Sequence, residues 1–142
     1  MMSDKPQKWV PERTPETAEY WLGCLRHELM IQRCAACGRH QFYPRLLCSA
    51  CSSRTLDWVR ASGRGSVKSF TIIRRAVSEA YVPDVPYVVA LITLEEGPTI
   101  MSNVCGCDVA AVRIGLPVEV VFEDWSAEVS IPKFTPAAHP SA

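Results

Sequence analysis

Long hydrophobic runs are missing from this sequence of 142 residues. No stretch approaches the roughly 18 apolar residues that a membrane-spanning helix requires. The opening residues, MMSDKPQKWVPERTPE, are polar and lack the apolar segment of a secretory signal. With 48% apolar and 21% charged residues, the composition is typical of a soluble globular chain of about one domain. We therefore expect a cytoplasmic protein that does not bind a membrane.

Catalytic signatures are also missing. The sequence contains no G-x-S-x-G, H-E-x-x-H, P-loop or dinucleotide-binding pattern. The three histidines, His27, His40 and His139, have no recognisable nucleophile or carboxylate arrangement beside them. We therefore expect that the chain is not an autonomous enzyme.

Cysteine, in contrast, is plentiful, and four of the seven fall within CAACGRHQFYPRLLCSAC. They form two C-x-x-C pairs with ten residues between them. Each pair lets two sulfurs reach one ion from a tight turn, and Gly38 supplies backbone freedom after the first pair. In a reducing compartment such pairs favour metal over disulfides. The predicted metal ligands are Cys34, Cys37, Cys48 and Cys51.

The metal itself is a choice between zinc and iron, because four thiolates in this spacing suit both. Zinc is favoured, since an electron carrier needs a docking surface for its redox partner and nothing in the sequence demands one. A closed four-ligand site has no position for water or substrate. We therefore expect it to stabilise the fold and not to catalyse hydrolysis.

Three cysteines lie outside these pairs: Cys24, Cys105 and Cys107. In NVCGCD the last two fall on the same side of a strand, which admits a second metal site or a reactive pair. No further ligand lies close in the sequence. We expect small, buried apolar side chains at these positions instead.

One amphipathic helix is predicted near the N-terminus. Thr14 supplies an N-cap hydroxyl, Pro15 occupies the first helical position and Glu16 places an acid in the first turn. Apolar side chains then recur at a spacing of three or four residues. They are Ala18, Trp21, Leu22, Leu25 and Leu29. The helix docks on its own domain or, because it is rich in Trp and Tyr, on a partner protein.

From Thr55 onward the pattern is that of β-strands, including the nearly continuous apolar stretch YVVALITLEE. About five strands in some 80 residues favour a small closed barrel, because closure removes exposed strand edges. An OB-like Greek-key barrel fits best, and an SH3-like barrel is the competitor. Asp108 is predicted to cap a short helical turn. This turn falls between the fourth and fifth strands, or near the third and fourth if TLDWVRAS belongs to the cysteine ribbon.

Charge is unevenly distributed although the net charge is zero. Residues 33–75 hold nine Lys and Arg against one acid, whereas residues 76–142 hold two Lys and Arg against nine acids. The split favours an anionic partner on one face, or mutual neutralisation of the two blocks within the fold.

A single-stranded nucleic acid is one anionic partner to consider, because aromatic residues that stack on bases are interleaved with the basic block. They are Phe42, Tyr43, Trp58 and Phe70. Dedicated nucleic-acid modules are distinctly basic, whereas this chain has a pI near 6.8. The same aromatics also suit the core of a small barrel. Nucleic-acid binding is therefore the alternative and not the main hypothesis.

The order of these features resembles one family throughout. A helix containing YW is followed by QRCAACGRHQFYPRLLCSAC, LDWVRASGRGSVKSFTII, VPYVVALITLEEGPTIMSN and VRIGLPVEVVFED. This series is similar to the zinc-ribbon OB-fold proteins associated with acyl-CoA enzymes, long filed as a domain of unknown function. The resemblance covers about residues 15–134. It retains all four ribbon cysteines, which some relatives lack.

The resemblance implies an N-terminal helix, a rubredoxin-like zinc ribbon and a C-terminal OB barrel. It also implies an accessory role beside a thiolase-like or lipid-transfer-protein-like enzyme, a MaoC-type enoyl-CoA hydratase or a hydroxymethylglutaryl-CoA synthase. Members are proposed to bind or channel acyl-CoA in lipid, steroid or polyketide pathways. The catalytic residues would belong to the partner.

Four segments follow from this reading: a helical segment at 1–31, the zinc ribbon at 32–58, the OB barrel at 59–134 and a tail at 135–142. Coenzyme A carries a diphosphate and a 3′-phosphate, so a basic face of the chain would hold it, or would instead pair with an acidic partner surface. The residues predicted for this face are Arg45, Arg64, Lys68, Arg74 and Arg75.

Overall fold

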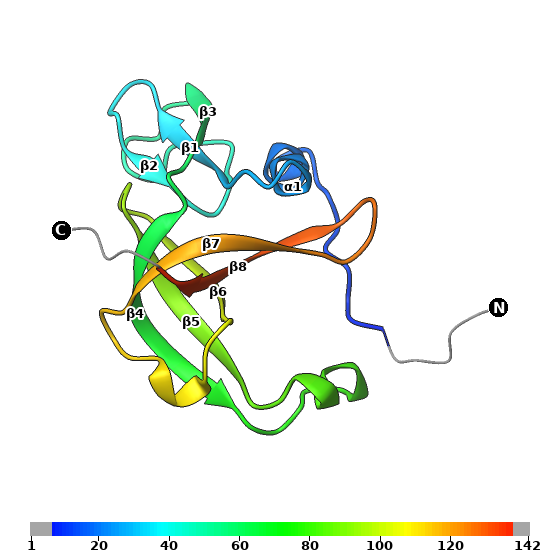
Figure 1. Cartoon of the computed structure of the whole chain (residues 1–142). Coiled ribbons are helices and arrows are strands. Elements are labelled where there is room, and N and C mark those ends of the chain that lie inside the picture. Colours follow the sequence, from blue (N-terminus) through cyan, green and yellow to red (C-terminus); the bar gives the residue numbers. More distant parts are fainter. Residues whose placement is uncertain (1–6, 138–142) are drawn as a thin grey trace.

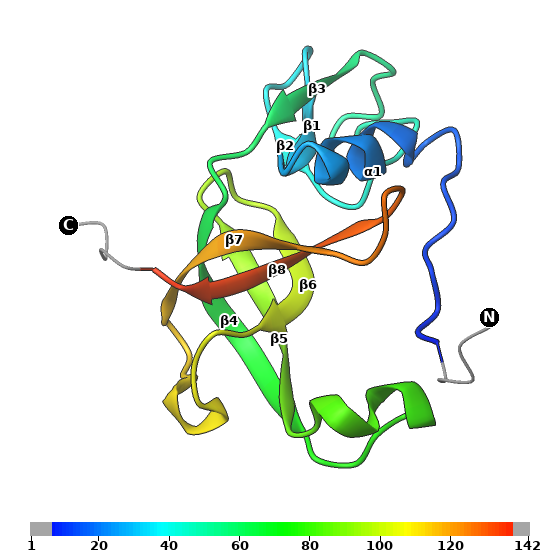
Figure 2. The same ribbon diagram turned by 45° about the vertical axis from the view of Figure 1, so that its right-hand side comes forward.

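The computed structural model describes residues 7–137. Figures 1 and 2 show a small ribbon and a helix lying together at one end of a β-barrel, while the N-terminal segment runs from the helix along one side of the barrel. The predicted fold class is confirmed: mainly β, with an N-terminal helix, a cysteine ribbon and an OB barrel. Residues 138–142 of the predicted tail lie outside the described residues. No helix among the described residues is both long and apolar enough to span a membrane.

The helix α1 (Ala18–Leu25) is shorter than predicted. Residues 15–17 form a turn in which Thr17 and Ala18 donate their backbone N–H groups to the Thr14 carbonyl. The predicted apolar stripe is also offset, because the buried face carries Thr17, Tyr20 and Cys24, and Leu22 is exposed. The prediction missed the face because Tyr20 and Cys24 were not counted among its apolar positions.

His27 explains why the helix ends before Leu29. It adopts a left-handed backbone with φ of 59° and donates its N–H to the Cys24 carbonyl, while Glu28 donates to the Gly23 carbonyl. This pair of hydrogen bonds is a Schellman motif, which terminates a helix. A left-handed histidine is uncommon, and no glycine marked the end in the sequence.

The ribbon is a three-stranded antiparallel sheet in the order β2-β1-β3. Its strands are β1 (Met30–Cys34), β2 (His40–Gln41) and β3 (Leu56–Arg60). The strand at TLDWVRAS therefore pairs with β1 in the ribbon and lies outside the barrel. Of the two predicted placements of this segment, in the barrel or in the cysteine ribbon, the second is confirmed.

Five further strands close into a barrel in the order β4-β5-β6-β8-β7. They are β4 (Arg64–Ile73), β5 (Tyr87–Leu94), β6 (Thr99–Val104), β7 (Pro117–Asp124) and β8 (Ser130–Pro136). A short 3₁₀ turn, η2 (Val109–Ala111), lies between the third and fourth barrel strands, and Asp108 caps it by accepting the Ala110 N–H. A second one, η1 (Glu79–Asp84), connects β4 to β5. This Greek-key order is that of an OB fold, so the SH3-like alternative is wrong.

One hydrophobic core joins the barrel to the helix and ribbon. Phe134, Ile92 and Val67 fill the barrel interior, and the same cluster continues through Ile31 of β1 and Tyr20 of α1. The helix contacts both β1 and β8. Because ribbon and barrel share buried side chains, we expect them to unfold together.

The barrel closes unevenly. β4 and β5 pair along most of their length, and so do β7 and β8. β6 and β8 instead meet through one parallel residue pair, Val104 with Phe134. The Cys105 N–H also donates to the Phe134 carbonyl, and the Ser102 hydroxyl donates to the Pro132 carbonyl. This seam is the shortest strand pairing in the barrel.

Candidate metal centre and the surface it supports

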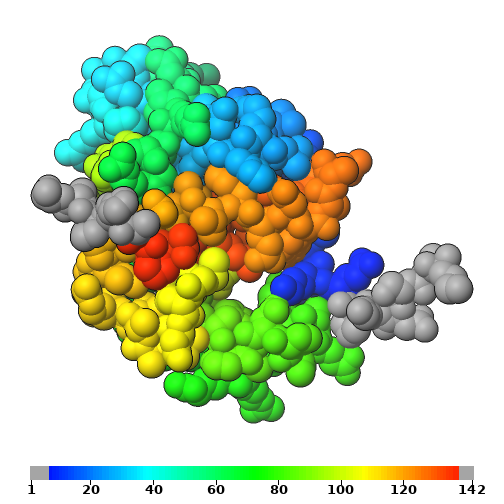
Figure 3. Space-filling model, viewed as in Figure 1, coloured from blue at the N-terminus to red at the C-terminus, as the bar shows by residue number. Residues whose placement is uncertain are grey.

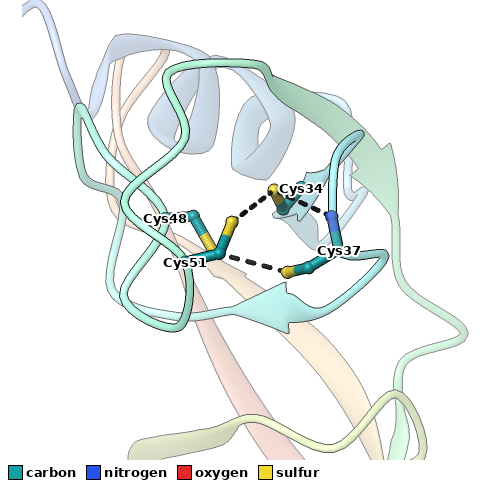
Figure 4. A group of neighbouring side chains, drawn as sticks. All are labelled: Cys34, Cys37, Cys48 and Cys51. Atoms are coloured by element: carbon teal, nitrogen blue, oxygen red, sulfur yellow. Dashed lines mark hydrogen bonds between the residues drawn. The ribbon is translucent and has the colours of Figure 1, made fainter.

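Four cysteine sulfurs converge at one end of the ribbon (Figure 4). Cys34 Sγ lies 3.6 Å from Cys51 Sγ, Cys37 Sγ lies 3.6 Å from Cys48 Sγ, and all four atoms lie within 4.8 Å of one another. A tetrahedral ion with metal–sulfur bonds near 2.3 Å places its sulfurs about 3.8 Å apart. The cluster therefore has the size and ligand set of a four-thiolate metal site.

Backbone amides prepare two of these thiols, Cys34 and Cys48, for a metal. The Cys37 N–H donates to Cys34 Sγ, and the Ala50 N–H donates to Cys48 Sγ. Such hydrogen bonds favour the thiolate. The Cys37 N–H lowers the pKa of Cys34 to about 6, and the backbone N–H groups of Cys51 and Ala50 lower the pKa of Cys48 below its ordinary value. Gly38 follows the first pair with φ of 78°, the left-handed conformation expected there. The local fold thus places four sulfur ligands toward a common centre.

Burial separates the cysteines of each pair. Cys34 and Cys48 are buried, while Cys37 and Cys51 are exposed. All four ligand positions of a tetrahedral ion are supplied by the chain itself, which leaves none for water or substrate. The site can therefore fix the ribbon but cannot act as an open Lewis-acid centre.

Two buried glutamines hold the loop between the cysteine pairs. Gln32 donates to the Arg45 carbonyl and accepts from the Arg45 N–H, both at 2.9 Å. Gln41 donates to Gln32 Oε1 at 2.8 Å and accepts from the Ser49 N–H at 2.9 Å. These residues were missed from the sequence. The available signal was a glutamine two residues before Cys34, on the same face of the strand as Met30 and Cys34.

This loop presents apolar side chains to solvent. Tyr43, Leu46 and Leu47 are 50%, 70% and 42% exposed. They stand beside Arg45, whose backbone is fixed by Gln32. A rigid loop with an exposed Tyr, Leu and Arg has the composition of a protein–protein contact. We refer to Tyr43, Arg45, Leu46 and Leu47 as the ribbon tip.

The predicted basic face is not one cluster. Arg45 lies on the ribbon tip, whereas Arg64 opens β4 and Lys68 stands at a bulge within it. Arg74 and Arg75 follow the far end of β4, about 30 Å from Arg64 along a strand of this length. The five residues therefore offer at least two separate contact points, and their role stays a prediction.

The remaining sequence candidates are distributed differently from expectation. Of the four aromatics considered for base stacking, only Tyr43 is exposed, while Phe42, Trp58 and Phe70 pack against the core. Cys24 is fully buried, as predicted. Cys105 and Cys107 are only partly buried, which corrects the prediction, and both line a cavity beside the β6–β8 seam. Neither belongs to a cluster of three or more possible metal ligands among residues 7–137.

Two family models match consecutive parts of the chain. The model of the ChsH2 rubredoxin-like zinc ribbon domain matches residues 21–57. The model of the ChsH2 C-terminal OB-fold domain matches residues 58–123. This chain belongs to the ChsH2, or DUF35, family. The membership confirms the resemblance seen in the sequence.

Relatives of this ChsH2-family chain include whole proteins and parts of larger ones. It is 35% identical over 109 residues to a DUF35 domain-containing scaffold protein of Methanothermobacter thermautotrophicus, covering 75% of this chain and 81% of that protein. It is 39% identical over 122 residues to the 3-oxo-4,17-pregnadiene-20-carboxyl-CoA hydratase alpha subunit of Mycobacterium tuberculosis, covering 82% of this chain. The chain spans only 37% of that subunit, and 39% of a probable enoyl-CoA hydratase alpha subunit of Thermomonospora curvata.

A solved structure of the family is also similar. The structure described as an Ltp2-ChsH2(DUF35) aldolase contains a chain that superimposes with a TM-score of 0.80 at 32% sequence identity. The match covers 89% of this chain and 98% of that one. Nearly the whole of that chain therefore has a counterpart in this one.

Proposed function

We propose that this chain is a non-catalytic accessory subunit of an acyl-CoA-processing complex. It binds a thiolase-like aldolase subunit or a MaoC-type hydratase subunit and helps to hold or channel the acyl-CoA. The observation that carries the proposal is the 98% coverage, at a TM-score of 0.80, of the chain in the Ltp2-ChsH2(DUF35) aldolase. The scaffold and hydratase-subunit names of its relatives agree with this role.

The metal in this proposal is zinc, and its role is structural. Four thiolates close the coordination sphere, and the family model for residues 21–57 is that of a zinc ribbon. Structural zinc contributes on the order of 10 kcal/mol in isolated modules. A ribbon that shares its core with a barrel depends on the metal less, so zinc mainly sets the conformation of the ribbon tip.

The ribbon tip is the proposed contact with the partner enzyme. The metal ligand Cys48 directly follows it, and the two buried glutamines bond to the Arg45 backbone and to the Leu47 carbonyl within it. Its apolar side chains therefore lose little conformational freedom on binding, which favours a stable complex. The basic residues along β4 are proposed to contact either the CoA phosphates or an acidic partner surface.

Copurification tests this function. The untagged chain is isolated from its native source, and mass spectrometry identifies the proteins that accompany it. A thiolase-like or MaoC-type subunit is expected. Leu46 and Ile114 are matched for the control, since both are 70% exposed but only Leu46 belongs to the ribbon tip. Leu46→Asp should release the partner and Ile114→Asp should retain it.

Two results would contradict the proposal. One is the absence of any acyl-CoA enzyme from the purified complex. The other is salt-dependent binding of a single-stranded oligonucleotide together with no partner enzyme, which would favour the nucleic-acid alternative.

A further inference from the structure

A cavity of about 590 Å³ lies outside the barrel wall, beside the β6–β8 seam. Figure 3 shows the molecule hollowed between the N-terminal segment, η1 and the β7–β8 hairpin. This volume is within the range of small-molecule sites. The metal site and ribbon tip do not contribute to it.

The wall of this cavity combines apolar, aromatic and thiol groups with a few polar side chains, of which Asn103 already donates its amide to the Val88 carbonyl. Tyr87 and Ile131 contribute from β5 and β8, and Cys105 and Cys107 from the turn after β6. Burial raises the pKa of the Cys105 thiol above its ordinary value, so this thiol is uncharged at neutral pH.

Each charged side chain that lines the cavity already has a partner. Lys8 pairs with Asp84 at 2.6 Å, and Lys133 pairs with Glu123 at 2.7 Å. No unpaired charge therefore faces the cavity among the described residues. A charged ligand group would have to break one of these pairs, whereas an uncharged apolar group would not.

Lys8 also closes one side of the cavity. Its ammonium group lies 5.2 Å from the centre of the Tyr81 ring and 5.6 Å from that of the Trp125 ring. Cation–π contacts of this kind add to the ion pair with Asp84. The N-terminal segment is thereby fixed against η1 and the β7–β8 turn, and the cavity keeps its shape without a ligand.

We infer that this cavity binds the uncharged acyl part of a thioester ligand. The inference rests on the proposed function, which supplies acyl-CoA as the ligand, and it adds where the acyl group lies. The aromatic rings, aliphatic side chains and thiols of the wall offer apolar surface that a hydrocarbon group covers with a gain from the hydrophobic effect. The CoA phosphates remain outside, because the cavity offers them no free cation.

The two cysteines in the wall provide a direct measurement in the unaltered protein. Iodoacetamide labelling of Cys105 and Cys107 is followed by peptide mass spectrometry, with octanoyl-CoA or acetyl-CoA present. Octanoyl-CoA at ten times its dissociation constant should slow labelling of both thiols about tenfold. Acetyl-CoA at the same concentration should not, because it shares the CoA group but lacks the chain. Equal labelling rates in the two solutions would overturn the inference.

A pair of variants tests the location independently. Ile131→Trp fills the cavity, while Ile114→Trp adds the same ring at an exposed position outside it. N-phenyl-1-naphthylamine, an uncharged apolar dye, should bind the wild type and Ile114→Trp, and its affinity should fall at least about tenfold in Ile131→Trp. Unchanged dye binding by an Ile131→Trp protein with a wild-type circular dichroism spectrum would overturn the inference.

Partner copurification separates this inference from the proposed function. If no partner enzyme copurifies with the wild-type protein, the proposed function is contradicted. An intact complex whose thiols are labelled at the same rate with both thioesters overturns the cavity inference alone.

Discussion

His27 Nε2 lies 2.8 Å from the Asp124 Oδ1 atom, 97 residues further along the chain. The same imidazole stacks on Phe122 with an interplanar angle of 2° and a centroid distance of 5.2 Å. His27 ends the helix and Asp124 ends β7, so this contact joins the helix–ribbon end of the molecule to the barrel. One residue thus terminates a helix and also connects two parts of the fold.

The left-handed backbone of His27 gives the first prediction. His27→Ala and His27→Gly both lose the contacts with Asp124 and Phe122, but only alanine is strained at φ of 59°. We expect the glycine variant to be more stable than the alanine variant by about 1 kcal/mol. Urea unfolding monitored by circular dichroism measures the difference. An alanine variant as stable as the glycine variant would contradict this role of the backbone.

The second prediction concerns acid. The hydrogen bond from His27 holds the pKa of the Asp124 carboxyl below its ordinary value. A carboxyl with a lowered folded-state pKa stabilises the fold above its unfolded-state pKa of about 3.9, and this contribution is lost as the pH falls through the folded-state value. The stability difference between wild type and Asp124→Asn should therefore shrink as the pH falls below about 4. Unfolding curves measured at a series of pH values test this, and a difference that grows below about pH 4 would refute it.

The third prediction concerns the metal. The purified protein should be colourless and contain one equivalent of zinc, which atomic absorption measures. Cys48→Ser should lose the metal, because the site has no spare ligand. Cys107→Ser should keep it, because that thiol lies in the cavity wall. A red protein containing iron would instead support a rubredoxin-like electron carrier.

The fourth prediction concerns the ribbon tip. Gln32→Ala removes the partner of the Arg45 N–H and carbonyl groups, which should cost about 1–3 kcal/mol. Hydrogen exchange at Arg45 and Ser49 should accelerate and partner affinity should fall, while zinc is retained. Arg33→Ala is the control, since Arg33 is the exposed neighbour of Gln32 on the same strand. Unchanged exchange in Gln32→Ala would show that the tip does not depend on this side chain.

The fifth prediction concerns the two groups of basic residues on and after β4. Replacing Arg64 and Lys68 with Ala should weaken CoA retention if this region holds its phosphates. The double variant Arg74→Ala with Arg75→Ala is the comparison, because these residues follow the opposite end of the strand. Unchanged CoA binding with lost partner assembly would instead assign Arg64 and Lys68 to an acidic partner surface. Isothermal titration with CoA and copurification distinguish the two.

Local signals in the sequence predicted the ribbon and barrel well. The spacing of Cys34 and Cys37 is that of a turn, and Gly38 marks the backbone conformation that the turn needs. Asp108 likewise caps a turn two residues away. Such features depend on neighbouring residues only, so composition and spacing suffice to identify them.

Features that depend on distant segments were missed. Gln32 contacts Arg45 and Gln41, and Cys105 lies opposite β8, because the fold brings them together and not because of their local pattern. The helix ends early because of a left-handed residue that is neither Gly nor Asn. The strand at residues 56–60 alternates like a barrel strand, and only its pairing with β1 assigns it to the ribbon.

The short seam between β6 and β8 affects how the barrel opens. The barrel is held shut there by one ladder pair and a few adjacent hydrogen bonds, so it is the place where the cylinder would first come apart. Val104 and Cys105 form the β6 side of the seam and also line the cavity. Ile131 and Lys133 line the same cavity from β8. A ligand in that cavity would contact both strands of the seam at once. Its binding would therefore stabilise the barrel at its shortest strand pairing.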